Sequence, residues 1–387
     1  MPNRAAIDAV LQRTVEAGAV PGVVALAADR NGVVYEGAFG RRDLSAAAPM
    51  TLDTVFWIAS MTKAVTSVAA MRLVEERRLE LDAPLGGLLP DLAAPEVLEG
   101  FAPDGTPRLR PAKRPITLRH LLTHTAGFSY NTWNAGMARY MEITGLPAPR
   151  SGRLASLRAP LVRDPGEAWE YSIATDWAGR VVEAAGGAGL DVLLRGLVLG
   201  PLGMADTGHV PGPSQQARRA RVHQRDGQGA LSPIDFALPE APEFLGGGGG
   251  LLSTGLDYLR FLRMLLGGGA LDGARVLRPE TVAEMARNQI GALEFRPLRT
   301  TMPAVSNDFD PFPEMSRKFG LGFLINTQDL PGRRAAGSLA WAGLGNTWFW
   351  VDPGRGMAGV LLTQILPFAD HAVLDLLAGF ETAVYAG

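Results

Sequence analysis

The chain has 387 residues, of which 47% are hydrophobic, and its 37 basic and 39 acidic side chains give a formal charge of −2. The length suits two or three structural units, and the near-neutral charge argues against a protein whose main task is to neutralise nucleic-acid phosphates. The absence of cysteine excludes disulfides, thiolate metal sites and a cysteine nucleophile. Only Lys63, Lys113 and Lys318 are lysines, so each lysine stands out in a chain that favours arginine.

The first 20 residues place charges at helical spacing between Ala, Val and Leu and lack the apolar stretch of a signal peptide. We therefore expect an amphipathic helix there, in a cytoplasmic protein. No run of 18 apolar residues is free of interruption, so no membrane partner is expected.

The predicted elements follow in chain order. Residues 22–28 and 33–39 read as a β-hairpin and residues 60–78 as a helix, while residues 94–115, rich in proline and charge, read as an excursion over the surface. Helical patterns recur at 117–122, 133–144, 175–185, 190–199, 254–266, 279–288 and 369–386, and strand patterns at 320–326, 347–351 and 357–364.

Strands thus cluster near both chain ends and helices in the middle. This predicts an α/β (α+β) fold in which residues 1–85 and 240–387 build one mixed sheet flanked by helices. Residues 86–239 are expected to form an inserted, mainly helical domain.

One lysine occupies an unusual setting. Lys63 carries the only charge between residues 54 and 71, and Ser60 precedes it by three positions, which places the two side chains on one face of a helix. Burial disfavours the ammonium form, so a lysine here can act as a general base, which an arginine cannot do. Spacing alone is weak evidence, because a chain with 13 serines and three lysines can show it by chance. A lysine on a half-buried helix can also reach solvent by extending its side chain.

Further motifs strengthen the assignment through a family resemblance. Ser60–Lys63, following Phe56–Ala59, resembles the S-x-x-K motif of the penicillin-recognising serine hydrolases. Residues 116–127 (ITLRHLLTHTAG), 165–172 (PGEAWEYS) and 246–254 (GGGGGLLST) resemble successive landmarks of the class C β-lactamase-like branch, in that order. The resemblance runs from about residue 20 to about residue 363 and implies a β-lactamase-like fold, in which the sheet from both chain ends is antiparallel.

The resemblance implies roles for individual residues. The second family motif, Tyr-x-Asn, falls at Tyr171 to Ile173, where the tyrosine is kept and isoleucine replaces asparagine. Ser60 would be the nucleophile, Lys63 and Tyr171 would share the work of base and proton relay, and the backbone N–H groups of Ser60 and Leu344 would form the oxyanion hole. Which of Lys63 and Tyr171 is the base stays open.

The third family motif, Lys-Thr-Gly in β-lactamases, aligns with Trp341 to Gly343, ahead of the strand expected at 347–351. A tryptophan there offers no charge for the carboxylate of a β-lactam and instead supplies an apolar wall. Such variants resemble the family VIII carboxylesterases. Trp341, Gly343 and Ile173 are therefore expected to contact substrate.

The sequence thus predicts a serine carboxylesterase that hydrolyses short-chain, small-molecule esters through an acyl-enzyme, without cofactor, metal or nucleic acid. A β-lactamase, a D-amino-acid peptidase, an acyltransferase and a non-catalytic penicillin-sensor-like protein stay open as alternatives. His120 and His124 share a helical face but lack an acidic partner motif, so we do not expect them to bind metal. The sequence does not predict the oligomeric state.

Overall fold

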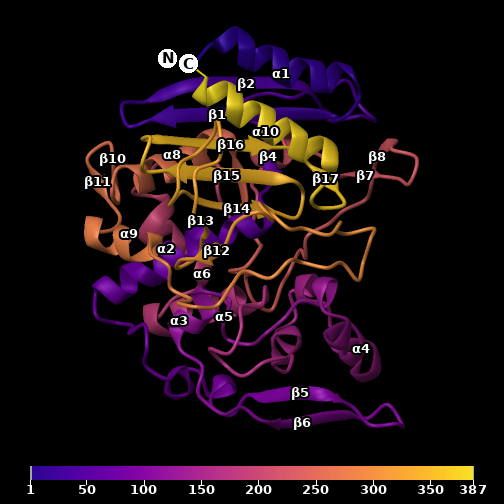
Figure 1. Ribbon diagram of the computed structural model, residues 1–387, viewed down its shortest axis with the longest axis vertical. Helices are drawn as coiled ribbons and strands as arrows, with labels where there is room; N and C mark the ends of the chain where they lie inside the picture. Colours follow the sequence, from indigo (N-terminus) through magenta and orange to yellow (C-terminus); the bar gives the residue numbers. More distant parts are fainter. Residues whose placement is uncertain (1, 387) are drawn as a thin grey trace.

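The computed structural model describes residues 2–386, and its main feature is an eight-stranded antiparallel sheet. The strands lie in the order β12-β13-β14-β15-β16-β1-β2-β3 (Figure 1). Their bounds are β1 Gly22–Asp29, β2 Val33–Asp43, β3 Ala48–Pro49, β12 Arg317–Phe319, β13 Leu324–Asn326, β14 Leu339–Gly343, β15 Thr347–Asp352 and β16 Met357–Leu362. In the centre Val24 of β1 faces Leu362 of β16, which confirms a sheet assembled from both ends of the chain.

Two sheet strands differ from expectation. The strand predicted over 320–326 is confined to β13, because Gly320 and Gly322 form a turn that joins it to β12. A Cβ on Gly320 would collide with the Met285 carbonyl, and Gly322 has a φ of 99°. The prediction also missed β14, which contains Trp341 and Gly343 and pairs along its whole length with β15.

Helices cover both faces of the sheet, as predicted. On one face α8 (Gly255–Leu266) packs against β1, β15 and β16. On the other, α1 (Arg4–Glu16) and α10 (His371–Tyr385) pack against each other, and the Phe380 ring lies 6.0 Å from that of Tyr35 and 5.6 Å from that of Trp350. Figure 1 shows α1 and α10 side by side at the end of the molecule where both termini lie.

The middle of the chain is mainly helical. The helices between residues 86 and 239 are α3 (Leu118–Leu122), α4 (Ala135–Thr144), α5 (Ala174–Gly186), α6 (Leu190–Leu194) and α7 (Pro213–Ala217). Of these, α5 packs against the buried helix α2 (Thr62–Glu75). Helix α2 was predicted to reach residue 78 but ends at Glu75, and Arg77, two residues further on, has a left-handed φ of 59° that an α-helix does not contain. The excursion expected over 94–115 is instead a hairpin, β5 (Glu96–Phe101) with β6 (Pro107–Pro111), at the far end from the sheet in Figure 1. The proposed domain boundaries stay a prediction.

Short elements complete the chain. They are the pair β4 (Val55–Trp57) and β9 (Leu252–Thr254), the trio β17 (Ile365–Leu366), β7 (His223–Arg225) and β8 (Leu231–Pro233), the pair β10 (Ala270–Leu271) and β11 (Ala274–Arg275), and α9 (Pro279–Ala286). Single helical turns lie at Ala59–Met61, Leu85–Gly87, Pro90–Leu92, Asn131–Trp133, Pro149–Ser151, Leu154–Arg158 and Arg195–Leu199. Among the helices of residues 2–386, none has the length and apolar character needed to span a bilayer.

Candidate active site

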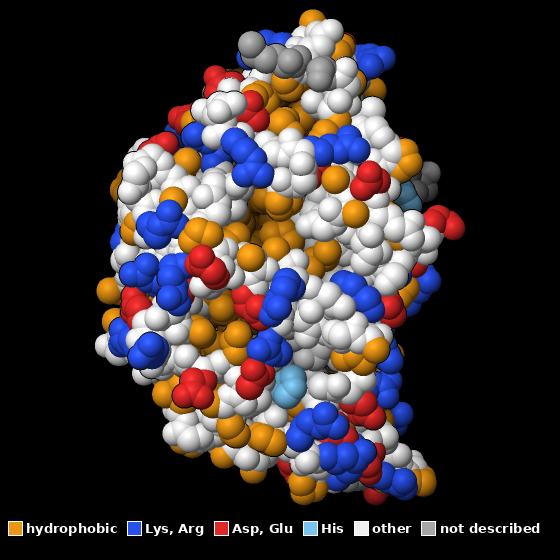
Figure 2. Space-filling model, turned by 60° about the vertical axis from the view of Figure 1, so that its left-hand side comes forward, with side chains coloured by type: hydrophobic (Ala, Val, Ile, Leu, Met, Phe, Trp, Pro, Cys, Tyr) orange, Lys and Arg blue, Asp and Glu red, His pale blue; other side chains and the backbone are white. Residues whose placement is uncertain are grey.

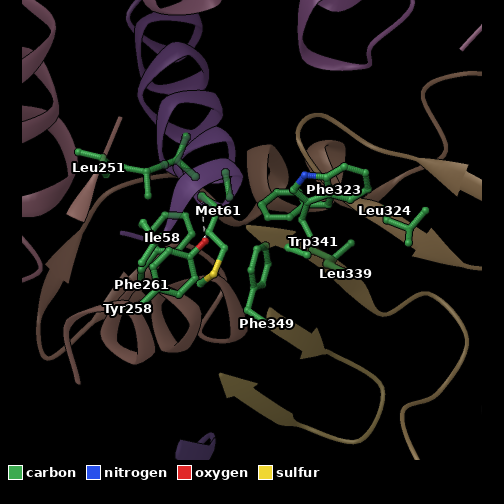
Figure 3. Packing of buried hydrophobic residues seen from close by; sticks show 14 of the residues in the cluster. Ile58, Met61, Leu251, Tyr258, Phe261, Phe323, Leu324, Leu339, Trp341 and Phe349 are labelled. Carbon is green, nitrogen blue, oxygen red and sulfur yellow. Dashed lines mark hydrogen bonds between the residues drawn. The ribbon is translucent and has the colours of Figure 1, made fainter. Parts of the chain in front are cut away.

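Ser60 lies in the single turn Ala59–Met61 that leads from β4 into α2. The turn is anchored in the core: Ile58 and Met61 pack with Tyr258 and Phe261 of α8 (Figure 3), and the Tyr258 hydroxyl donates to the Met61 carbonyl at 3.0 Å. Ala59 has a φ of 44°, a left-handed conformation that costs energy for a residue with a side chain. The surrounding packing thus fixes Ser60 at the start of α2.

Lys63 is only 2% exposed and fills its hydrogen-bonding capacity. Its Nζ atom donates to the Ser60 hydroxyl at 3.2 Å, to the Tyr130 hydroxyl at 3.1 Å and to the Gly248 carbonyl at 2.7 Å. An ammonium has three hydrogens for these three acceptors, and a neutral amine would keep two donors and accept from Ser60. The arrangement therefore suits both protonation states that a base passes through.

Tyr130 was missed by the sequence analysis. It follows the ITLRHLLTHTAG segment, lies 67 residues from Lys63 in sequence and makes a hydrogen bond to Lys63 Nζ. Burial, the negative charge of Asp176 and the neighbouring Tyr171 keep the pKa of Tyr130 well above 10. Tyr130 therefore stays a protonated hydroxyl whose own hydrogen is available to a bound molecule.

Tyr171 also lies beside Lys63, but its hydroxyl is hydrogen-bonded to Trp341. Its ring centre is 4.9 Å from Lys63 Nζ, and its hydroxyl accepts a 3.2 Å hydrogen bond from the indole N–H of Trp341. Within residues 2–386, no hydrogen bond joins the Tyr171 hydroxyl to Ser60 or Lys63. The structure thus brings the predicted residues Ser60, Lys63 and Tyr171 together. A hydrogen bond links Tyr171 to Trp341.

The glycine run links Lys63 to a buried carboxylate. The Gly248 carbonyl accepts from Lys63, and the N–H of the same residue donates to Asp176 Oδ1 at 2.9 Å. A Cβ on Gly248 would lie 2.7 Å from Asp176 Oδ2, so this position needs glycine. Burial raises the pKa of Asp176, and the positive charge of Lys63 opposes that rise.

The predicted oxyanion donors lie on two segments that pack closely. A Cβ on Gly343 would collide with the Ile58 carbonyl and the Thr347 hydroxyl, so glycine lets the end of β14 approach the turn that carries Ser60. Leu344 follows at once, before Asn346 with a φ of 57°. Within the described chain, no hydrogen bond satisfies the N–H of Ser60 or of Leu344, so both are available to an oxyanion.

Two cavities meet at these residues, since Ser60, Trp133 and Leu344 line both. The larger, about 380 Å³, is mainly apolar and includes Tyr171 and Trp341. The smaller, about 200 Å³, includes Tyr130 and Asp176. At about the level of β14, the face in Figure 2 is hollowed and hydrophobic side chains gather there.

Two residues predicted to contact substrate lie elsewhere. Ile173 is buried at the start of α5 and lines neither cavity, because its side chain belongs to the hydrophobic core. Gly343 also lines neither cavity and acts through its close approach to Ile58.

The two histidines have structural surroundings. His124 is buried against Tyr171 and hydrogen-bonds Ser172, and burial, followed by the charge of Lys63, holds its pKa well below 6.5. The side chain of His120 caps α3. Between residues 2 and 386, no three His, Asp or Glu side chains are grouped so that they could hold a metal ion.

Comparison with known proteins decides the family. The family model described as Beta-lactamase matches residues 7–383. The chain belongs to the Beta-lactamase family. As expected for that family, its fold is β-lactamase-like.

The chain is similar to proteins named as a methylbutanoyltransferase, an esterase and a synthase. Monacolin J acid methylbutanoyltransferase of Aspergillus terreus is 35% identical over 98% of this chain and 95% of that protein. Lovastatin esterase of Penicillium rubens is 34% identical over 98% of both chains. Unliganded simvastatin synthase from Aspergillus terreus, at 33% identity, superimposes with a TM-score of 0.86 over 99% of this chain and 98% of its own. This chain is thus a member of a serine hydrolase and acyltransferase family.

Proposed function

We propose that this protein is a serine carboxylesterase that cleaves short-chain esters through an acyl-enzyme on Ser60. The observation that carries the proposal is the hydrogen bond between Lys63 Nζ and the Ser60 hydroxyl, placed where two cavities meet. A nucleophile, an adjacent base and two unoccupied N–H donors are the groups that acyl transfer requires.

The proposed reaction begins with neutral Lys63. Lys63 takes the Ser60 proton as the serine oxygen attacks the ester carbonyl, and the oxyanion accepts from the N–H groups of Ser60 and Leu344. The tetrahedral intermediate collapses with cleavage of the bond to the alcohol oxygen. The alcohol leaves with a proton relayed from Lys63 through a tyrosine. Water then attacks the acyl-enzyme while Lys63 takes its proton, the bond between the acyl carbon and the Ser60 oxygen breaks to release the carboxylic acid, and Lys63 returns the proton to the Ser60 oxygen.

Tyr130 is hydrogen-bonded to Lys63 Nζ and can pass its proton on directly, whereas the Tyr171 hydroxyl has no such bond among residues 2–386 and would require the Lys63 amine to turn toward it. Tyr171 lines the larger cavity with Ser60, and Tyr130 lines the smaller one. A hydroxyl donates to the leaving oxygen only from the cavity that this oxygen enters. We therefore assign the relay to Tyr171 if the alcohol leaves through the larger cavity and to Tyr130 if it leaves through the smaller.

The wall around Ser60 favours esters over β-lactams. Trp341 occupies the third-motif position, and its N–H is already bonded to Tyr171. It therefore presents apolar surface and no cation to a β-lactam carboxylate. The names of the two relatives, an esterase and an acyltransferase, support an ester substrate.

Transfer of the acyl group to an organic alcohol or amine is a second candidate. It is favoured by the pair of cavities, since the acyl group can occupy one while an acceptor occupies the other. Such an acceptor would replace water in the second half of the reaction.

A chain-length series of p-nitrophenyl esters tests the proposal beside nitrocefin, with and without an alcohol acceptor. We expect p-nitrophenyl butyrate to be hydrolysed, Ser60→Ala to abolish hydrolysis, and a serine-reactive phosphonate to label the peptide that carries Ser60. Efficient turnover of nitrocefin would indicate a β-lactamase. Labelling without turnover of any ester would indicate a penicillin-sensor-like binding protein.

A further inference from the structure

The smaller cavity is lined by a cation that has no carboxylate partner among residues 2–386. Arg150 lies in the turn Pro149–Ser151 and lines this cavity together with Ser60. Its side chain keeps an exposed surface. Throughout residues 2–386, no carboxylate lies within 4.0 Å of its guanidinium, which also donates no hydrogen bond. Its N–H groups are therefore available to a ligand.

Aromatic rings hold the Arg150 guanidinium in place. Its Cζ atom lies 5.0 Å from the ring centre of Phe236 and 5.9 Å from that of Trp57. The two rings are 4.6 Å apart, and the Trp57 indole N–H is bonded to the Gly249 carbonyl at 2.8 Å. Contact with the ring faces orients a guanidinium while its edge keeps the paired N–H groups that match a carboxylate.

The charges around the two cavities differ. In the smaller, the only carboxylate among the lining residues is Asp176, which accepts from the Gly248 N–H and is opposed by the charge of Lys63. The larger is lined by charges of both signs, and Arg334 there is hydrogen-bonded to Glu381 at 2.7 Å. Its other charged lining residues include Asp308, Asp310 and Arg333. Arg150 therefore gives the smaller cavity a positive charge that no carboxylate of the described residues pairs with.

We propose that Arg150 recognises a carboxylate on the part of the substrate that enters the smaller cavity, so that the preferred substrates are esters carrying a free carboxylate. This inference rests on the proposed esterase function and names its substrate class. A guanidinium binds a carboxylate through two parallel, charge-assisted hydrogen bonds. Arg150 would place this recognition away from the third-motif position, where Trp341 carries no charge.

The test compares substrates that differ only in charge. One series contains butyrate esters of ω-hydroxy acids with one to five methylene groups, each beside its primary amide. The other contains p-nitrophenyl monoesters of dicarboxylic acids, each beside the corresponding half-amide. We expect wild type to prefer the carboxylate by roughly 10- to 100-fold in kcat/KM at one or more spacer lengths. The preferred series tells whether the alcohol or the acyl part enters the smaller cavity.

Variants then assign the preference to Arg150. Arg150→Gln should lower the carboxylate-to-amide ratio to about one, and Arg150→Lys should retain part of it. Arg153→Gln is the matched control, because Arg153 lies three residues on, is exposed and lines neither cavity; it should keep the wild-type ratio. A wild type without preference in either series, or a preference that survives in Arg150→Gln, would overturn the proposal.

A binding measurement separates failure of this inference from failure of the esterase function. If wild type cleaves no ester, the proposed function is wrong. Calorimetric titration of the same ω-hydroxy acids into wild type and Arg150→Gln then tests carboxylate recognition alone. Equal affinity in the two proteins would reject it, and weaker binding to Arg150→Gln would support it.

Discussion

Lys63 donates to the hydroxyl of Tyr130 at 3.1 Å as well as to that of Ser60. Tyr130 thus helps to fix the position of the lysine amine. The two residues form one hydrogen-bonded unit, although 67 positions separate them in the sequence.

The first prediction concerns this contact. Tyr130→Phe removes an acceptor from Lys63 and should lower kcat/KM for p-nitrophenyl butyrate by roughly 10- to 100-fold. Tyr140→Phe is the control, since Tyr140 lines neither cavity. Unchanged kinetics in Tyr130→Phe would show that Tyr130 has no part in orienting the base.

The second prediction concerns the chemistry of Lys63. Lys63→Arg should be nearly as damaging as Lys63→Ala, with losses of roughly 10²- to 10⁴-fold in kcat, because arginine does not release a proton near neutral pH. Lys113→Arg changes an exposed lysine in the same way and should retain full activity. A well-functioning Lys63→Arg variant would mean that only a positive charge is needed.

The third prediction concerns the approach of β14 to Ser60. Gly343→Ala introduces a methyl group against the Ile58 carbonyl and should lower the free energy of unfolding by about 1–3 kcal/mol. It should also lower kcat, because Leu344 would move away from the oxyanion. Denaturant unfolding and kinetics measure the two effects, and Gly87→Ala, which would meet nothing within 4 Å, serves for comparison. A stable, fully active Gly343→Ala protein would refute the oxyanion assignment.

The fourth prediction concerns Asp176, whose pKa is raised by burial. The Asp176 carboxyl group binds its proton more tightly in the folded protein than in the unfolded chain, where its pKa is 3.8. The stabilisation from the protonated carboxyl group is therefore complete below pH 3.8 and is lost as pH rises through the folded-state pKa. Asp176→Asn should therefore gain stability relative to wild type between pH 3 and pH 7. It should also lose roughly tenfold in kcat/KM, since Gly248 loses a charged acceptor. Thermal melts across this pH range test the sign.

The fifth prediction has the opposite sign. The Arg110 guanidinium and the Lys113 backbone N–H bind Asp164 and hold its pKa below the usual 3.8. Its stabilisation is present above pH 3.8 and is lost as pH falls toward the folded pKa. Asp164→Asn should melt below wild type at pH 6, and the difference should narrow below pH 3.8. A difference that stays constant with pH would contradict this assignment.

The sequence predicted the features that depend on local spacing. Ser60 and Lys63 are three positions apart on adjoining helical turns, so their contact follows from helix geometry. We did not predict a role for Tyr130, because its own segment contains no motif that indicates one. Only tertiary packing brings its hydroxyl to Lys63. We did not predict the strand β14, because it is five residues long and mostly buried on both faces. Its sequence therefore shows no alternation of polar and apolar residues.

The resemblance to known enzymes located Tyr171 and Trp341 but not their bond to each other. That bond depends on the register of β14 against β15, which places Trp341 opposite Phe349 and was not predictable from the motif. We also did not predict a role for Arg150, because the sequence contains many arginines and nothing distinguishes this one. Only the structure shows that Arg150 lines a cavity with Ser60.

Gly248 takes part in two hydrogen bonds, one from Lys63 to its carbonyl oxygen and one from its own N–H to Asp176. The N–H and the carbonyl belong to adjacent peptide planes that meet at the Gly248 Cα atom, so the backbone torsions φ and ψ of this one residue set their relative orientation. A change in either torsion moves one hydrogen-bonding group relative to the other. The backbone conformation of Gly248 should consequently couple the position of the Lys63 amine to that of the Asp176 carboxylate.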